Sequence, residues 1–173
     1  MNLSKKKLNR VIMWSYGDEG KTYLLYRGLL GLKNFTTIHT VGFNVETIDF
    51  NGVNITFYDV GGACKIKDLR SHYLPISDAV IFLIDSSVFI SDTYFYENIE
   101  EFKRCLPFVE NIPLLIAITK IDIRKEKTLD LINAYQLQDL YKRKAKFGII
   151  ECSSFTMEGI KEIKYWCSSI CQK

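Results

Sequence analysis

Four short apolar runs, each bounded by turn-forming residues, constrain the fold more than any other feature of the chain. Their near-continuous apolar character predicts strands that are buried on both faces. The runs are Val11–Trp14, Ala79–Ile84, Pro113–Thr119 and Phe147–Cys152. Helical patterns alternate with them, near residues 21–32, 92–109, 128–143 and 157–171. Alternating buried strands and helices predict a parallel sheet with helices on both sides.

One stretch breaks this alternation. Phe43–Phe50 and Val53–Tyr58 are strand-like and are joined by Asn51-Gly52, the strongest short signal for a β-hairpin. We therefore expect an α/β fold with a mostly parallel six-stranded sheet and one antiparallel hairpin at its edge. No linker divides the chain, so we expect one domain over residues 1–173, with residues 1–9 as a short N-terminal tail.

The composition is that of an ordinary globular protein and excludes several classes. The 173 residues are 47% hydrophobic and 25% charged, which suffices for a core without disulfides. The apolar runs are far shorter than the roughly 20 residues of a membrane-spanning helix. A net charge of +3 is too balanced to favour nucleic acid as a partner. The five scattered cysteines argue against a disulfide framework or zinc site and favour the cytoplasm.

A phosphate-binding loop follows the first predicted strand. The segment Ser15-Tyr-Gly-Asp-Glu-Gly-Lys-Thr22 matches the Walker A pattern except that Ser15 stands at the first glycine. Lys21 is expected to reach the β- and γ-phosphates, and the Thr22 hydroxyl to bind Mg²⁺. Backbone N–H groups at a helix N-terminus favour phosphate, although an ordinary helix start is the alternative. The predicted nucleotide-binding residues of this loop are Gly17, Asp18, Glu19, Gly20, Lys21, Thr22 and Tyr23.

A second polar motif, Thr119-Lys-Ile-Asp122, closes another buried strand and therefore lies at the same carboxyl edge of the sheet. Asp122 can accept hydrogen bonds from guanine N1–H and the 2-amino group, a pair that adenine lacks. The stem of Lys120 is expected to pack on the base. Cys152 and Ser153 end the last strand, where a backbone N–H near Ser153 would meet the guanine O6.

Between these motifs lie the residues expected to sense a γ-phosphate. Thr40 is predicted to complete the coordination of Mg²⁺, and Asp59 to hold the metal through water. The N–H of Gly62 is predicted to touch a γ-phosphate oxygen. Loss of that phosphate would release the two loops that carry Thr40 and Gly62, as in a GTPase switch.

These elements resemble the Arf family of small GTPases. Thr40-Val-Gly-Phe-Asn-Val-Glu46 and Asp59-Val-Gly-Gly62, separated by the predicted hairpin, carry the resemblance, which extends from about Arg10 to Cys171. It implies the small-GTPase fold and a molecular switch that binds GTP or GDP with Mg²⁺. It also implies effector and exchange-factor proteins as partners, and a role in membrane traffic or a related process.

Three aromatic residues match the cluster that Arf proteins present to these partners. They are Phe43, Tyr58 and Tyr73, with Tyr58 in place of a tryptophan. Ordinary packing of the sheet is the alternative explanation for them. We expect a monomer.

The chain departs from the Arf pattern at several positions. Ala63 stands where the family has the glutamine that orients the attacking water, so we expect very slow GTP hydrolysis and assign no catalytic residue. His39 replaces a proline, Thr119 an asparagine and Ser153 an alanine. Together with Ser15, these changes bear on nucleotide affinity.

The ends of the chain also differ from the family. Asn2 stands where N-myristoylation requires glycine, and Cys171 does not form a prenylation site. Lys5–Lys7 offer at most weak attraction to acidic lipid. We therefore expect a cytoplasmic protein whose contact with membranes is weak, peripheral or indirect.

Two rival functions are compatible with parts of the sequence. Ser15 and Ala63 favour a scaffold that is locked with GTP or free of nucleotide and does not cycle. Lys21, Thr22 and Asp122 favour nucleotide binding. A P-loop kinase is less favoured, because the chain has no lid-like insertion or arginine cluster.

Overall fold

The structure is a computed structural model that describes residues 9–34, 43–50, 52–61 and 72–170. Its strands are β1 (Asn9–Trp14), β2 (Phe43–Phe50), β3 (Val53–Val60), β4 (Ala79–Asp85), β5 (Leu114–Thr119) and β6 (Phe147–Glu151). Its α-helices are α1 (Lys21–Tyr23), α3 (Thr93–Val109), α4 (Thr128–Ala134) and α5 (Ile160–Ile170). A π-helix, η1 (Leu24–Leu29), continues α1, and the 3₁₀ segments are η3 (Leu74–Ile76), η4 (Ile121–Ile123) and η5 (Leu137–Lys142).

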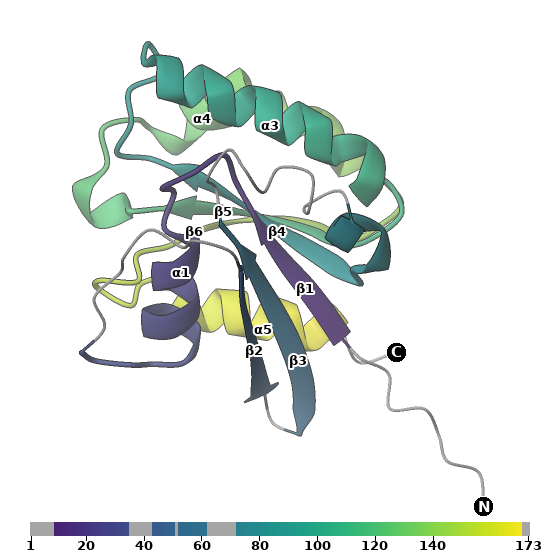
Figure 1. Cartoon of the computed structure of the whole chain (residues 1–173). Helices are drawn as coiled ribbons and strands as arrows, with labels where there is room; N and C mark the ends of the chain where they lie inside the picture. The colour runs from purple at the N-terminus through teal and green to yellow at the C-terminus, as the bar shows by residue number, and fades with distance from the viewer. Residues whose placement is uncertain (1–8, 35–42, 51, 62–71, 171–173) are drawn as a thin grey trace, which may run out of the picture.

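The strands form one six-stranded sheet in the order β2-β3-β1-β4-β5-β6 (Figure 1). Neighbouring strands are parallel except β2 and β3, which pair antiparallel with Phe43 opposite Val60 and Phe50 opposite Val53. Gly52, in the connection between them, has φ +86°, a left-handed conformation that glycine adopts without strain. The predicted fold class, with its antiparallel edge hairpin, is confirmed.

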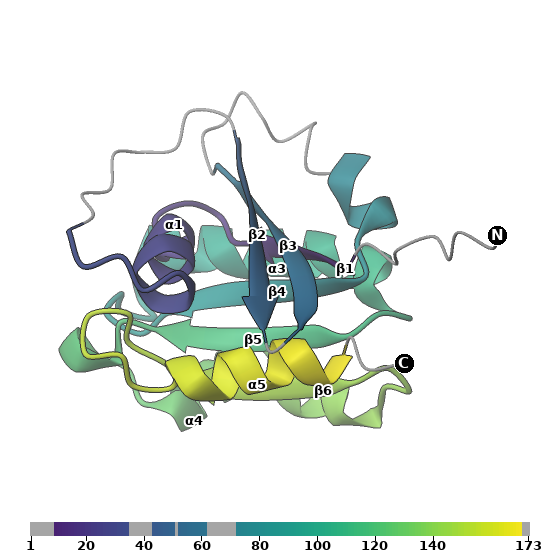
Figure 2. The same ribbon diagram turned by 90° about the horizontal axis from the view of Figure 1, so that it is seen from below.

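The sheet has a hydrophobic core on each face. Side chains of β4 alternate between the two cores, as expected for a strand buried on both sides. Ile81 and Leu83 pack with residues of η1 and α5. Phe82 and Ile84 pack with residues of α3 and α4. Figures 1 and 2 show α1 and α5 together on one side of the sheet and α3 on the other.

The helix predicted over 128–143 is interrupted. The helix α4 ends at Ala134, Gln136 adopts a left-handed φ of +54°, and the 3₁₀ segment η5 follows. Leu131 and Leu137 are both fully buried in the same core. At 100° per residue they would lie on different sides of one continuous α-helix. The break brings both side chains into the core, and the prediction of one helix was wrong.

Two other predicted helices also differ from the structure. The last helix begins at Ile160 rather than near residue 157, because Met157 and Gly159 have left-handed φ angles of +68° and +72°. A Cβ on Gly159 would lie 1.9 Å from the Glu151 carbonyl oxygen, so this close approach requires glycine. The first helix changes from α to π geometry at Leu24.

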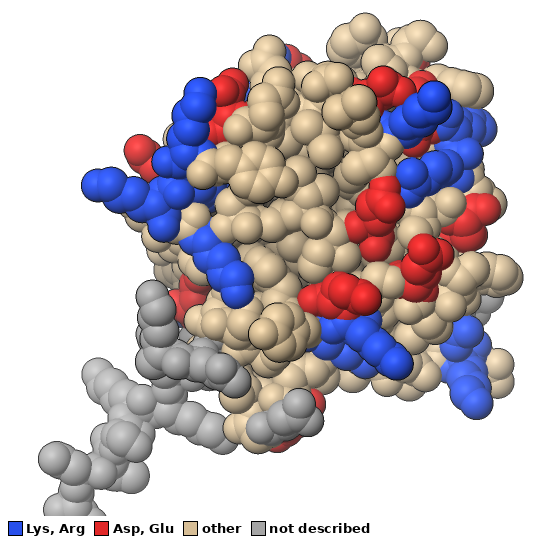
Figure 3. All heavy atoms as spheres, turned by 180° about the vertical axis from the view of Figure 1, so that it is seen from behind, with Lys and Arg blue, Asp and Glu red and all other residues tan. Residues whose placement is uncertain are grey.

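No helix within the described ranges is both long and apolar enough to cross a membrane. Cys105, Cys152 and Cys167 are buried free thiols. Burial raises the pKa of Cys105 and of Cys152 to about 12. Charged side chains of both signs surround a broad uncharged area on the face shown in Figure 3.

Candidate functional site

Polar groups from several segments meet at the carboxyl edge of the sheet, where parallel strands of this architecture present their ligand sites. The Thr119 hydroxyl, at the end of β5, donates to the Glu19 carbonyl oxygen at 2.7 Å. The ammonium of Lys120 donates to the Asp18 carbonyl oxygen at 2.9 Å and to Asp85 Oδ2 at 2.6 Å. The loop after β1 is therefore attached directly to the ends of β4 and β5.

The phosphate-loop lysine is held inside its own loop. The side chain of Lys21 is only 4% exposed, and its Nζ donates to Ser15 Oγ at 2.5 Å and to the Gly17 carbonyl oxygen at 2.7 Å. The serine that departs from the Walker A pattern thus supplies an oxygen acceptor to the lysine. Gly20, which precedes α1, has a left-handed φ of +93°. The Lys21 ammonium therefore lies at the start of the first helix, where a phosphate would be expected.

Two of the three residues predicted to act with Mg²⁺, Thr22 and Asp59, lie in direct contact. The Thr22 hydroxyl donates to Asp59 Oδ2 at 2.6 Å, and Asn44 Nδ2 donates to the same oxygen at 3.1 Å. Asp59 is fully buried, and its other oxygen, Oδ1, has no hydrogen-bond partner in the described part of the chain. A buried carboxylate with an unpaired oxygen beside a hydroxyl group offers the oxygen ligands that Mg²⁺ prefers. The donor set therefore fits Mg²⁺.

The predicted base-binding motif forms a tight turn after β5. Lys120 has a left-handed φ of +57°, and its Cε would lie 3.8 Å from a Cβ on Gly20, so its stem crosses close to the phosphate loop. Asp122, in η4, is exposed to solvent. The turn contacts the loop after β6, because the N–H of Ile121 donates to the Cys152 carbonyl oxygen at 3.4 Å.

The loop after β6 is fixed by its own hydrogen bonds. Ser153 is buried, and its Oγ accepts the N–H groups of Phe155 at 3.2 Å and Thr156 at 3.1 Å. The N–H of Ser153 donates to the Glu158 carbonyl oxygen at 3.0 Å. This N–H was predicted to meet the guanine O6. In this structure it is paired within the protein.

The three predicted partner-binding aromatics form one cluster. The ring centroids of Phe43 and Tyr73 are 5.7 Å apart, and those of Tyr58 and Tyr73 are also 5.7 Å apart. Phe43 is 47% exposed, although it is a large apolar residue. The cluster joins the edge hairpin to the segment before η3.

Sequence reasoning missed two side chains that accept hydrogen bonds from the backbone of the phosphate loop. Tyr94 and Asn98, both in α3, accept the N–H groups of Asp18 and Tyr16 respectively, the latter at 2.9 Å. Burial raises the pKa of Tyr94, and the Glu19 carboxylate raises it further. These residues lie in a helix far along the chain and carry no motif. Asp85 could have been found, because it ends β4 at the same edge as Thr119.

Four residues of the predicted switch lie outside the described residues. They are His39, Thr40, Gly62 and Ala63.

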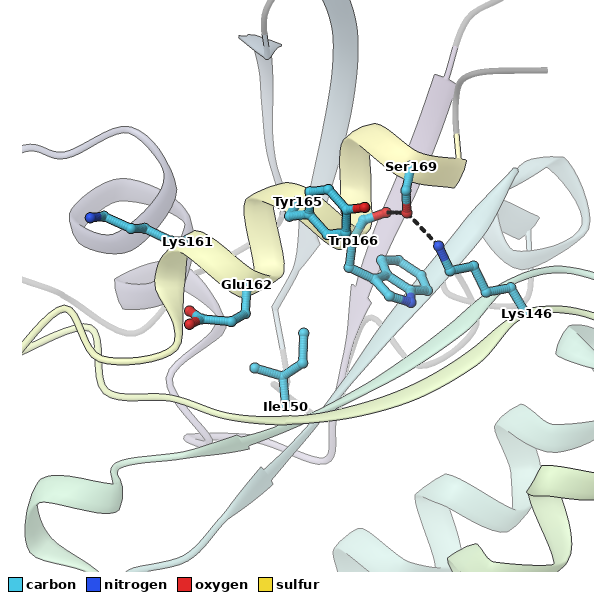
Figure 4. Close-up of a pocket in the computed structure, with 7 residues that line it drawn as sticks. All are labelled: Lys146, Ile150, Lys161, Glu162, Tyr165, Trp166 and Ser169. Carbon is cyan, nitrogen blue, oxygen red and sulfur yellow. Dashed lines mark hydrogen bonds between the residues drawn. The ribbon is translucent and has the colours of Figure 1, made fainter.

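A separate pocket of about 470 Å³ lies between β6 and α5 (Figure 4). It is lined by Lys146, Ile150, Lys161, Glu162, Tyr165, Trp166 and Ser169. None of the predicted site residues lines it. The pocket and the carboxyl-edge site are therefore distinct.

Comparisons with known proteins match nearly the whole chain to one family. The model of the ADP-ribosylation factor family matches residues 1–171. ADP-ribosylation factor J of Dictyostelium discoideum is 33% identical over 165 residues, which cover 93% of this chain and 84% of the relative. ADP-ribosylation factor K of the same organism is 32% identical over 168 residues, with the same coverages.

A solved structure gives the same result for the fold. The Arl6 (BBS3) small GTPase from Trypanosoma brucei, with the bound nucleotide analogue GppNp, superimposes with a TM-score of 0.78. It is 25% identical in sequence, and the match covers 94% of this chain and 96% of that chain.

Proposed function

Because the chain belongs to the ADP-ribosylation factor (Arf) family of small GTPases, we propose that it binds GTP and GDP with Mg²⁺ and acts as a molecular switch for protein partners. One observation carries the proposal. Lys21, the Thr22–Asp59 pair and the Lys120 turn, which the sequence assigns to three parts of one nucleotide, come from distant segments and meet at one edge of the sheet.

We propose that the β-phosphate binds to the backbone N–H groups of the loop that leads into α1, from Gly17 to Lys21, with Tyr23 beside them. The N–H groups of Gly17 and Asp18, which donate to Glu19 Oε2 and to the Tyr94 hydroxyl oxygen in this structure, would then change partner. Turning the Lys21 ammonium from Ser15 Oγ and the Gly17 carbonyl towards the phosphates exchanges two hydrogen bonds to neutral acceptors for bonds to anionic oxygens, which are stronger. The positive end of the helix adds to the attraction.

Thr22 and Asp59 would hold Mg²⁺, with Thr40 completing its coordination in the GTP form. When bound, the metal neutralises charge on the β- and γ-phosphate oxygens. The Thr22 hydroxyl and the unpaired Asp59 Oδ1 are the oxygens that support this assignment. Gly62 would contact the γ-phosphate.

We propose that Asp122 selects guanine and that the stem of Lys120 packs on the base, with Thr119, Cys152 and Ser153 framing the pocket. The exposure of Asp122 agrees with a carboxylate available to a ligand. The bonds of the Thr119 hydroxyl and the Lys120 ammonium to Glu19 and Asp18 link the base pocket to the phosphate loop.

Ala63 cannot orient a water molecule, so we propose very slow hydrolysis and a bias towards the GTP-bound form. Effectors and exchange factors would meet the cluster of Phe43, Tyr58 and Tyr73. From membership of the family we propose a role in membrane traffic or a related process, in the cytoplasm or peripherally at membranes.

A second candidate is a scaffold that does not cycle. The contacts of Lys21 with Ser15 and Gly17 favour it, because a lysine satisfied within its own loop depends less on a phosphate partner. Nucleotide binding separates the switch from a nucleotide-free scaffold, and nucleotide exchange separates it from a scaffold that is locked with GTP.

The test is a competition assay on the full chain with a fluorescent GDP analogue and Mg²⁺. Unlabelled GDP and GTP should displace the analogue at much lower concentration than ADP or ATP. An Asp122→Ala variant should lose at least 100-fold in affinity for the guanine analogue, since it removes a hydrogen-bonded recognition group. Asp130→Ala, which removes another exposed carboxylate in α4, is the control and should bind as the unmodified chain does. Equal displacement by ADP would refute the proposal.

A further inference from the structure

The side chain of Glu19 lies beneath the phosphate loop and is completely buried, with 0% exposure. Its Oε2 accepts the N–H of Gly17 at 2.8 Å and lies 4.0 Å from Lys21 Nζ. Its Oε1 has no hydrogen-bond partner among the residues that the structure describes. A carboxylate thus occupies the interior side of a loop whose expected ligand is itself an anion.

A buried carboxylate is costly unless a cation compensates it. Lys21, 4% exposed, is the cation that the geometry offers to Glu19. Lys120, the other lysine of the site, already pairs with Asp85 at 2.6 Å. Glu19 and Lys21 therefore form a buried pair of opposite charges in the phosphate loop.

We propose that Glu19 is an internal counter-ion of the phosphate-loop lysine, which weakens nucleotide binding and speeds nucleotide release. The inference rests on the proposed nucleotide function of the same site. A bound polyphosphate shares Lys21 with the carboxylate and is repelled by it through buried protein, where water does not screen the charges. Nucleotide-free protein keeps the Lys21 charge compensated, so the empty loop is stabilised relative to the loaded one.

The substitution Glu19→Gln isolates the charge. Glutamine has nearly the same volume, and its amide oxygen can still accept the N–H of Gly17, so loop geometry is retained while the negative charge is lost. We expect the affinity for the fluorescent GDP analogue to rise on the order of 10- to 100-fold, because the substitution removes the repulsion between the carboxylate and the bound phosphates. Most of the change should appear as slower release, because attraction within a site acts mainly on the dissociation rate.

Glu162→Gln is the matched control, because it makes the same chemical change at an exposed position of α5. It should leave affinity and release unchanged. A merely structural role for Glu19 predicts weaker binding on substitution, so the direction of the change separates the two roles. If circular dichroism shows that Glu19→Gln does not fold, Glu19→Leu, which is uncharged and of similar volume, is measured in its place.

A thermal-unfolding assay with inorganic pyrophosphate separates this inference from the proposed function. Pyrophosphate should raise the melting temperature of Glu19→Gln more than that of the unmodified chain, whether or not guanine is recognised. If guanine nucleotides fail to bind but pyrophosphate still raises the melting temperature of Glu19→Gln more, the counter-ion role is supported and the proposed function is refuted. If the unmodified chain binds GDP and Glu19→Gln binds it equally or more weakly, the counter-ion role is overturned. If neither chain responds to nucleotide or pyrophosphate, the counter-ion role and the proposed function are both refuted.

Discussion

The hydroxyl of Thr119 joins the end of β5 to the phosphate loop, and replacing it by Thr119→Val should measure the strength of that link. The hydroxyl is buried and donates to the Glu19 carbonyl oxygen at 2.7 Å, with a longer contact of 3.3 Å to the Ile84 carbonyl oxygen. Valine has nearly the same shape but cannot donate, so the Glu19 carbonyl loses a buried partner.

Loss of one partner of a buried hydrogen bond costs about 1–3 kcal/mol, and the retained volume keeps the cavity term small. We expect the free energy of unfolding to fall by about 1–2 kcal/mol. For a domain of this size, each kcal/mol lowers the melting temperature by about 2–4 °C. The shift should therefore be about 2–8 °C.

Urea denaturation followed by circular dichroism measures this change, with Thr119→Ser as the matched control. Serine keeps the donor and loses only a methyl group, so it should remain closer to the unmodified chain than valine does. Thr119→Val should also weaken binding of the fluorescent GDP analogue, because the loop loses one of its two attachments to the end of β5. Equal stability of the valine variant and the unmodified chain would refute the argument that this hydroxyl holds the loop.

Three further predictions concern hydrolysis, backbone geometry and buried thiols. Ala63→Gln should speed single-turnover GTP hydrolysis at least tenfold, and fast turnover by the unmodified chain would contradict the assignment. Gly159→Ala should destabilise the fold by at least about 3 kcal/mol, through the 1.9 Å approach to the Glu151 carbonyl, whereas Gly31→Ala, with φ +75° and open space, should cost only about 1 kcal/mol in a urea titration. Because burial raises the pKa of Cys105 and Cys152 to about 12, their thiolates should be scarce at pH 8 and their alkylation should keep rising with pH beyond 9. Peptide mapping after iodoacetamide treatment checks this, and rapid labelling of the folded protein at pH 8 would count against it.

The apolar runs predicted the sheet because burial on both faces leaves a signal in each residue of a strand. The runs at Ala79–Ile84 and Pro113–Thr119 became β4 and β5 with small changes at their ends. The hairpin could be predicted because Asn51-Gly52 favours its turn locally. Because both motifs follow parallel strands, the sequence also predicted that they meet at the carboxyl edge of the sheet, although they lie about 100 residues apart.

Other features depend on contacts that the sequence does not display. The break at Gln136 arises because Leu131 and Leu137 must reach one core, and helical periodicity alone does not specify where a chain turns. Glu19 lies within the phosphate-loop motif, but at a position where the pattern accepts any residue, and a loop glutamate is ordinarily solvated. Only the structure places its carboxylate beneath the loop, against Gly17 and Lys21.

The identity of the nucleotide released when the purified protein is denatured tests the central claim most directly. The protein is purified in Mg²⁺, unfolded, and the supernatant is separated by ion-exchange chromatography against GTP, GDP, ATP and ADP standards. Our account predicts that the nucleotide recovered carries guanine, and that it is mainly GTP because Ala63 slows hydrolysis. Release of GDP alone would contradict the slow hydrolysis, and an adenine nucleotide or none would contradict the assignment of the carboxyl-edge site to guanine nucleotides.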